Sequence, residues 1–464
     1  MARREHWRGI LEWNSQSLNM TSSSNLACKM YDAALTQFIG FYDDSNLGGL
    51  DKTVEKMLHE DPDFVMGRCL EVGLLLNSTV RNPEFDQESR EKLNLLNQTV
   101  KAKSKLYPRE KRHVEAVRLF ASGDPVGATL EWEKILIEHP TDIHALRMAL
   151  DSYFWRGVQR EMRDSVARVL PFWQSGALPL KEYLYGMHAF GLCETNLFEK
   201  AEAQARKGLK RNINDAWAAH AIAHVYEMQG KAVEGFKFLD DNEKNWSVCN
   251  HFSGHMYWHE ALFKIEMNAY DEASQIMENI LLTRAKNIGG PLAIVDLNSL
   301  LYRLHLTGSE NLVRPGHWNA AYEVCKPYLR SHGTSFNDAH FLMAALGSDN
   351  VDVAEEILES YKDIDPLISG PKDVVTNLLK AMIAYKREQY SEAVELLIPV
   401  RSQFRKIGGS EAQRDLFSQL LIVSAIKSKS EYHRKLAEHL LNERDGLRSN
   451  SFLDGRLVNR LNQI

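Results

Sequence analysis

The 464-residue chain has few of the residues that usually form turns. It contains 13 prolines and 27 glycines, which together are 40 of the 464 residues. This share is smaller than the roughly 12% that these two residues make up in average proteins. Turns between strands tend to consume glycine, proline or asparagine, so this shortage disfavours a protein built mainly of sheets. It favours helices joined by short connections.

The chain also has little that would bring it to a membrane or to nucleic acid. No window approaches the ~20 uninterrupted apolar residues that a membrane span requires, and residues 1–6 lead into polar sequence without the apolar core of a signal peptide. The net charge of -6 provides no field that would attract nucleic acid or an anionic membrane. We therefore expect a cytoplasmic protein with neither partner.

The five cysteines are widely spaced and odd in number. They form neither a disulfide framework nor a CxxC metal site. Other enzyme signatures are missing as well, since we find no GxxxxGK[ST] phosphate loop, no GxGxxG motif after a strand and no GxSxG elbow. The sequence therefore leaves it open whether the protein is an enzyme, and it favours the view that it is not.

A pair of small residues twelve positions apart recurs along the chain. In residues 116–140, AVRLFASGDPVGATLEWEKILIEHP, Ala116 and Ala128 form such a pair, and Trp132 and Pro140 follow at multiples of four. This spacing is typical of a tetratricopeptide helix pair, in which two antiparallel helices approach closely at the small residues. Four further pairs repeat it: Ala189/Ala201, Ala223/Gly235, Ala261/Ala273 and Ala381/Ala393.

The apolar residues follow helical spacing, and no stretch alternates as a strand would. We predict an all-α fold, a tetratricopeptide-like α-α superhelix (solenoid) of stacked helix pairs, because a single repeat cannot bury its apolar face. Loops are expected at 78–106, 286–290 and 307–316. The predicted segments are an N-terminal extension (1–24), degenerate N-terminal repeats (25–106), central tetratricopeptide repeats (107–285), C-terminal repeats (286–448) and a tail (449–464).

Five stretches of the sequence carry a more specific resemblance. They are ACKMYDAALTQ (27–37), DPDFVMG (61–67), RDSVARVLPFW (163–173), FNDAHFLMAALG (336–347) and GGSEAQRDLFSQLLI (408–422). Through them the chain closely resembles the tetratricopeptide repeat protein 38 family, from about Asn25 to Arg448. The resemblance implies a helical-repeat protein and no established reaction.

Histidine is concentrated in the middle of the chain, where ten of the 17 lie between residues 188 and 340. Resemblance to tetratricopeptide proteins implies that positions 2, 5, 9 and 12 of each first helix line a concave groove. If Ala223 is position 8, then His220, His224 and Glu227 are positions 5, 9 and 12. Residues spaced i, i+4 and i+7 share one face of a helix, so all three are expected to point into the groove.

The next repeat extends this cluster. With Ala261 as position 8, His255 takes position 2, Trp258 takes position 5, and His259 lies one turn beyond His255. His251 could join from the preceding loop. Two adjacent helices would then present up to four imidazoles and a carboxylate to the same wall.

Three interpretations of this cluster remain open. Neutral imidazoles at i and i+4 can chelate one metal ion, and a nearby glutamate could ligate it or act as a base. The histidines could also catalyse a reaction without a metal. In the third interpretation they hydrogen-bond between packed helices or bind a partner's carboxylate. An HExxH metalloprotease motif is excluded, because Phe263 stands where its second histidine would be.

Other polar residues on apolar helices are candidates for the same groove. Asp296 and Arg303 are seven apart and could share a face, where an intramolecular salt bridge is the simplest interpretation. Asp338 and His340 lie at an expected helix start, where Asp338 would suit an N-cap.

The leading hypothesis is a scaffold whose concave groove binds a peptide or protein partner. The alternative is an enzyme or small-molecule binder with a divalent metal at His220, His224, His255 and His259; no other cofactor is expected. The predicted groove residues are His220, His224, Glu227, His255, Trp258, His259, Asp296, Arg303, Asp338 and His340.

Overall fold

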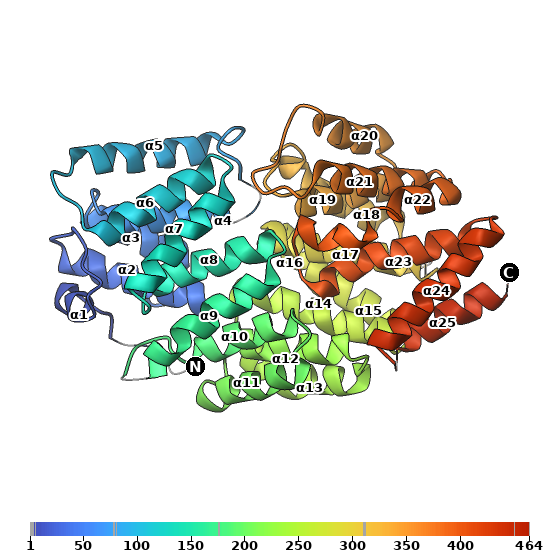
Figure 1. Cartoon of the computed structure of the whole chain (residues 1–464), viewed down its shortest axis with the longest axis horizontal. Coiled ribbons are helices and arrows are strands. Elements are labelled where there is room, and N and C mark those ends of the chain that lie inside the picture. The colour runs from blue at the N-terminus through green and yellow to red at the C-terminus, as the bar shows by residue number, and fades with distance from the viewer. Residues whose placement is uncertain are drawn as a thin grey trace. The chain divides into compact units, whose positions relative to one another are not determined.

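The computed structural model describes residues 4, 6–77, 79, 81–174, 177–309, 312–449 and 451–463, without the side chains of Asn250 and His251. Within these ranges the chain is helical from α1 to α25 (Figure 1). The one β-type pairing that these residues form is an isolated bridge between Thr334 and Ile368. The predicted all-α fold is confirmed. None of the helices in the described part is both long enough and apolar enough to cross a membrane.

The chain divides into two compact units. Unit 1 comprises residues 1–154, 158–219 and 248–250, and unit 2 comprises residues 155–157, 220–247 and 251–464. The division passes through helix α12 (Ala216–Met228), whose histidine-bearing end belongs to unit 2. The five segments proposed from the sequence stay a prediction.

Unit 1 is built from the helices that precede α12. They are α1 (Ile10–Ser15), α2 (Asn25–Gly40), α3 (Gly49–Glu60), α4 (Val65–Asn77), α5 (Gln87–Ala102), α6 (Pro108–Ala121), α7 (Pro125–Glu138), α8 (Ile143–Trp155), α9 (Gln159–Gln174), α10 (Tyr183–Cys193) and α11 (Phe198–Arg211).

Unit 2 contains the helices that follow α12, together with the π-helix η1 and the 3-10 helices η3 and η4. They are α13 (Ala232–Trp246), α14 (Asn250–Glu266), α15 (Tyr270–Ile276), η1 (Met277–Leu282), α16 (Thr283–Asn287), α17 (Pro291–Leu306), α18 (Pro315–Cys325), η3 (Lys326–Tyr328), α19 (Ser335–Gly347), α20 (Val351–Ser360), α21 (Lys372–Lys386), α22 (Tyr390–Leu397), η4 (Arg401–Ile407), α23 (Glu411–Lys427), α24 (Glu431–Leu447) and α25 (Phe452–Asn462).

Small residues lie where consecutive helices meet, as the twelve-residue spacing predicts. Ala116 on α6 and Ala128 on α7 are fully buried, and their helices pack against each other, as do α10 with α11 and α21 with α22. Gly235 on α13 shows the same steric requirement at the interface with the next helix, α14. A Cβ atom there would lie 2.3 Å from the ring of Phe263 on α14, so only glycine permits this approach.

The loop expected at 78–106 is wrong for most of its length, because α5 occupies Gln87–Ala102. Asp86 caps this helix by accepting a hydrogen bond from the Ser89 amide at 2.8 Å. Among its apolar residues only Leu96 is fully buried. A helix with so narrow an apolar face carries a weak periodic signal.

Candidate metal centre

Two helices of the chain supply the central histidines. Helix α12 carries His220 and His224, and α14 carries His255 and His259. A spacing of four residues places both imidazoles of a helix on the same face, one turn apart. Alanine-rich sequence, AWAAHAIAHVYEM, favours helix in α12, and its small side chains leave room around the two rings.

The four imidazoles converge. One nitrogen from each of His220, His224, His255 and His259 can be chosen so that all four atoms lie within 4.8 Å of one another. The Nε2 atom of His220 lies 2.9 Å from His224 Nε2 and 3.1 Å from His255 Nε2. A tetrahedral ion with metal–nitrogen distances of about 2.0–2.1 Å has ligands about 3.3 Å apart. The nitrogens are therefore close to metal-binding positions.

Carboxylates hold the outer nitrogens of two of these rings. His255 Nδ1 lies 3.0 Å from both oxygens of Asp296, and His259 Nδ1 lies 3.0 Å from Glu227 Oε2. A neutral imidazole that donates from Nδ1 has its lone pair on Nε2. The Nε2 atom of His259 is buried and has no hydrogen-bond partner in the described part of the chain. This carboxylate–histidine arrangement is the one that orients imidazoles toward a metal.

Burial keeps three of the four histidines neutral. It lowers the pKa of His220, His224 and His259 well below the usual value, and neighbouring histidines lower it further. None of the four histidines is more than 5% exposed. Because a metal binds the unprotonated imidazole, the rings of His220, His224 and His259 are in the ligating form near neutral pH.

The two carboxylates that contact the cluster, Asp296 and Glu227, differ in the partners that balance their negative charge. Burial raises the pKa of Asp296, and among the described residues His255 is the partner that opposes this effect. Burial also raises the pKa of Glu227, where Arg448 opposes it. Asp296 is therefore a buried acid without an arginine or lysine to balance it, as expected beside a cation that the polypeptide does not itself provide.

Aromatic rings exclude water from the cluster. The Trp258 ring stacks on His255 with centroids 5.1 Å apart, and Phe252 lies edge-on to His220 at 4.9 Å. Trp258 is fully buried. The cluster is thus surrounded by aromatic rings, by the two carboxylates and by arginines that act on its charge, Arg303 on His259 and Arg414 on His224. Burial from water strengthens these electrostatic interactions.

The predicted salt bridge between Asp296 and Arg303 is wrong. Both lie on α17, but Asp296 bonds His255, whereas Arg303 donates to the carbonyl of Ala412 at 2.6 Å and lies 3.6 Å from Asp415. Seven residues place two side chains near one face without making them meet. Each side chain instead bonds a residue that lies on another helix.

Asp338 and His340 are not part of the four-histidine group. The N-cap of α19 is Thr334, so the N-cap interpretation of Asp338 is wrong. Asp338 accepts a hydrogen bond from the Tyr361 hydroxyl at 2.8 Å, and His340 Nδ1 lies 2.8 Å from the carbonyl of Phe336. The side chain of His251 lies outside the described residues.

Nine of the ten predicted groove residues are buried, and Glu227 is close to buried. Their contact with a partner stays a prediction. What the sequence alone did not reveal is the pairing of Asp296 with His255, 41 positions away, for which no local spacing is a signal.

No family model matches the chain. It is similar to the crystal structure of the yeast Tom70, with a TM-score of 0.32 and 13% sequence identity over 93% of this chain and 88% of that one. The similarity is low, so the description as helix pairs rests on the helices of this chain.

Proposed function

We propose that unit 2 is built around a divalent metal ion bound by His220, His224, His255 and His259. The observation that carries this proposal is the convergence of four buried imidazole nitrogens. Zn²⁺ suits the site well, since it accepts four nitrogen ligands in a tetrahedral arrangement. Asp296 and Glu227 would orient two of the rings and supply the negative charge that balances the ion.

The role of the ion in this proposal is structural. Catalytic zinc keeps one coordination position open for water or substrate, whereas structural zinc has four protein ligands. Four histidines fill the tetrahedron, and the aromatic rings around them exclude solvent. The ion would join α12 to α14 and, through Asp296, to α17. Its binding free energy would then add to the stability of unit 2.

Elemental analysis of the purified, Zn²⁺-loaded protein tests the proposal. We expect about one equivalent of zinc in the wild type and none in His220→Ala/His224→Ala. His144→Ala is the matched control, because it removes a fully buried histidine from unit 1 and should leave the zinc content unchanged. A wild-type protein that takes up no metal, or whose thermal stability is the same with and without chelator, contradicts the site.

A second function is supported by the helix pairs. Stacked pairs of this kind generally form surfaces for protein partners, and we propose that the chain is also a cytoplasmic scaffold for a peptide or protein segment. None of the five cysteines forms a disulfide and all are buried, which suits a reducing compartment.

The scaffold proposal has its own test. Affinity capture with the wild type is compared with Glu227→Ala and Trp258→Ala, the two non-histidine residues predicted for the centre of the groove. Loss of a partner in either variant supports a role for this region. Unchanged partners would remove these two residues from the binding surface.

A further inference from the structure

The three helices that surround the proposed metal site all end against one C-terminal segment. We call Arg448 together with α25 (Phe452–Asn462) the C-terminal clamp. The Arg448 guanidinium lies 3.4 Å from the sulfur of Met228, the last residue of α12. Arg456 donates to the carbonyls of Ile265 at 2.6 Å and Glu266 at 2.9 Å, at the end of α14.

The third contact is made on α17. Arg460 donates to the carbonyl of Leu306, the last residue of that helix, at 3.0 Å. The final carbonyls of a helix have no partner within it and carry partial negative charge. An arginine therefore donates the hydrogen bonds that these carbonyls lack, and its positive charge balances their partial negative charge. The clamp places one arginine at the end of each helix that contributes a ligand or its supporting carboxylate.

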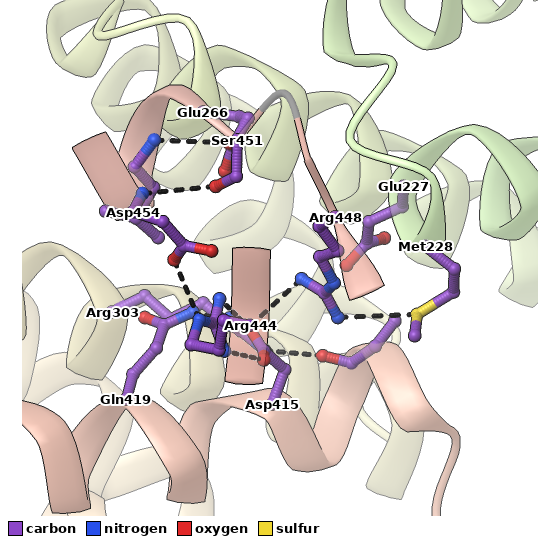
Figure 2. A network of polar contacts seen from close by, with 12 residues as sticks. Glu227, Met228, Glu266, Arg303, Asp415, Gln419, Arg444, Arg448, Ser451 and Asp454 are labelled. Atoms are coloured by element: carbon purple, nitrogen blue, oxygen red, sulfur yellow. Dashed lines mark hydrogen bonds and ion pairs between the residues drawn. The ribbon is translucent and has the colours of Figure 1, made fainter. Parts of the chain in front are cut away.

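A buried ion-pair network fixes the clamp in this position (Figure 2). Asp415 on α23 pairs with Arg444 and, at 3.4 Å, with Arg448. Arg444 in turn donates to Asp454 of α25 at 2.7 Å. Burial alone would raise the pKa of Asp415, but its arginine partners hold it well below the usual range. The acid stays charged and the network stays intact at neutral pH.

A small cavity lies between the clamp and the metal site. Its volume is about 30 Å³, enough for one water molecule. The lining includes Glu227, Phe263, Arg303, Arg448 and Leu453. Glu227 is the carboxylate that holds His259, so this cavity reaches the supporting residues of the site from the side that the clamp covers.

From these contacts we infer that the C-terminal clamp controls how fast the metal ion leaves and enters the four-histidine site. This inference rests on the metal site proposed above. With the clamp seated, the ends of α12, α14 and α17 are held together and the imidazoles cannot separate. Its release frees the end of α14, opens the cavity beside Glu227 and lets water reach His259.

The experiment measures transfer of zinc from the full-length, Zn²⁺-loaded protein to excess chelator. We expect Arg456→Ala/Arg460→Ala to release zinc at least about tenfold faster than the wild type, corresponding to about 1.4 kcal/mol in the barrier. Arg456→Lys, in the otherwise wild-type chain, keeps a cation at the end of α14 and should stay close to the wild-type rate. Arg401→Ala is the control, because it breaks the exposed pair with Glu443 in the same unit.

The outcomes separate the two proposals. A wild type that takes up no zinc overturns the metal site and the clamp together. Zinc uptake with release rates that are equal in the double variant, the control and the wild type overturns the clamp alone. If the double variant does not fold, Arg460→Ala, which removes a single hydrogen bond, is measured in the same way and should also release zinc faster.

Discussion

Each unit of the chain has a buried histidine centre, and the two centres balance their charges differently. In unit 1, Asp142 pairs with Arg109 at 2.7 Å and with His113 Nε2 at 3.0 Å. His144 stacks on His113 with centroids 4.7 Å apart and lies 2.8 Å from the Tyr31 hydroxyl. In unit 2, by contrast, imidazole nitrogens lie against imidazole nitrogens, since His220 Nε2 lies 2.9 Å from His224 Nε2 and 3.1 Å from His255 Nε2.

The difference shows why a count of histidines says little about function. The Asp142 carboxylate has a permanent cation, Arg109, so unit 1 balances its buried charge with its own side chains. Among the described residues, Asp296 in unit 2 has His255 as its one partner. The Nε2 atom of His220 lies within 3.1 Å of the Nε2 atoms of both His224 and His255. One proton on His220 Nε2 cannot satisfy two acceptors well. The metal ion that we propose for unit 2 would resolve this arrangement, and unit 1 has no such need.

The largest effect that separates the centres is expected from Asp142→Ala. The substitution leaves Arg109 buried without its carboxylate and removes the cap of α8, where Asp142 accepts from the Ala145 amide at 3.0 Å. Loss of one partner of a buried pair typically costs about 3–5 kcal/mol. Urea unfolding followed by circular dichroism measures it, with exposed Asp51→Ala as control. A loss below about 1 kcal/mol contradicts the role given to Asp142. Zinc content should not change.

Acid should lower the free energy of unfolding through a buried histidine of unit 2, His340. Burial lowers the pKa of His340 to about 4, against about 6.5 in an unfolded chain. Between these values the unfolded chain binds more protons, so the contribution is fully present above about pH 6.5 and is lost as the pH falls toward 4. The total is about 3 kcal/mol.

His340→Leu should therefore flatten the dependence of the unfolding free energy on pH between 6.5 and 4. Unfolding is measured across this range in the wild type, in His340→Leu and in His59→Leu, which changes an exposed histidine of unit 1. Equal slopes in all three proteins would show that His340 is not held neutral by burial.

The smallest effect in this comparison of the two centres is expected from a change to one carboxylate of unit 2, Asp296. Asp296→Asn removes the charge behind His255 and keeps the size of the side chain. Outer carboxylates of this kind typically contribute 10- to 100-fold to metal affinity, or about 1.4–2.7 kcal/mol. Competition for Zn²⁺ against a calibrated chelator measures the change. Asp338→Asn, a buried aspartate on α19 outside the cluster, should bind zinc as the wild type does.

Helical features of the fold were predictable because they depend on neighbours in sequence. The small pair Ala116/Ala128 marked two packed helices, and the spacing of His220 and His224 placed both rings on one face. Prediction failed where the local signal was weak or the partner was distant. The apolar face of helix α5 is too narrow to give a clear periodic pattern in the sequence. Asp296 and Arg303 each bond a residue from another helix.

By itself the sequence determined the helical class, the close helix pairs and the histidines that share a face, because 3.6 residues per turn translate spacing directly into direction. Only the tertiary structure decided that the faces of α12 and α14 meet, that Asp296 supports His255, and that the C-terminal arginines reach the ends of the same helices. Those contacts join segments tens to hundreds of residues apart. They depend on how helices pack, which no local period encodes.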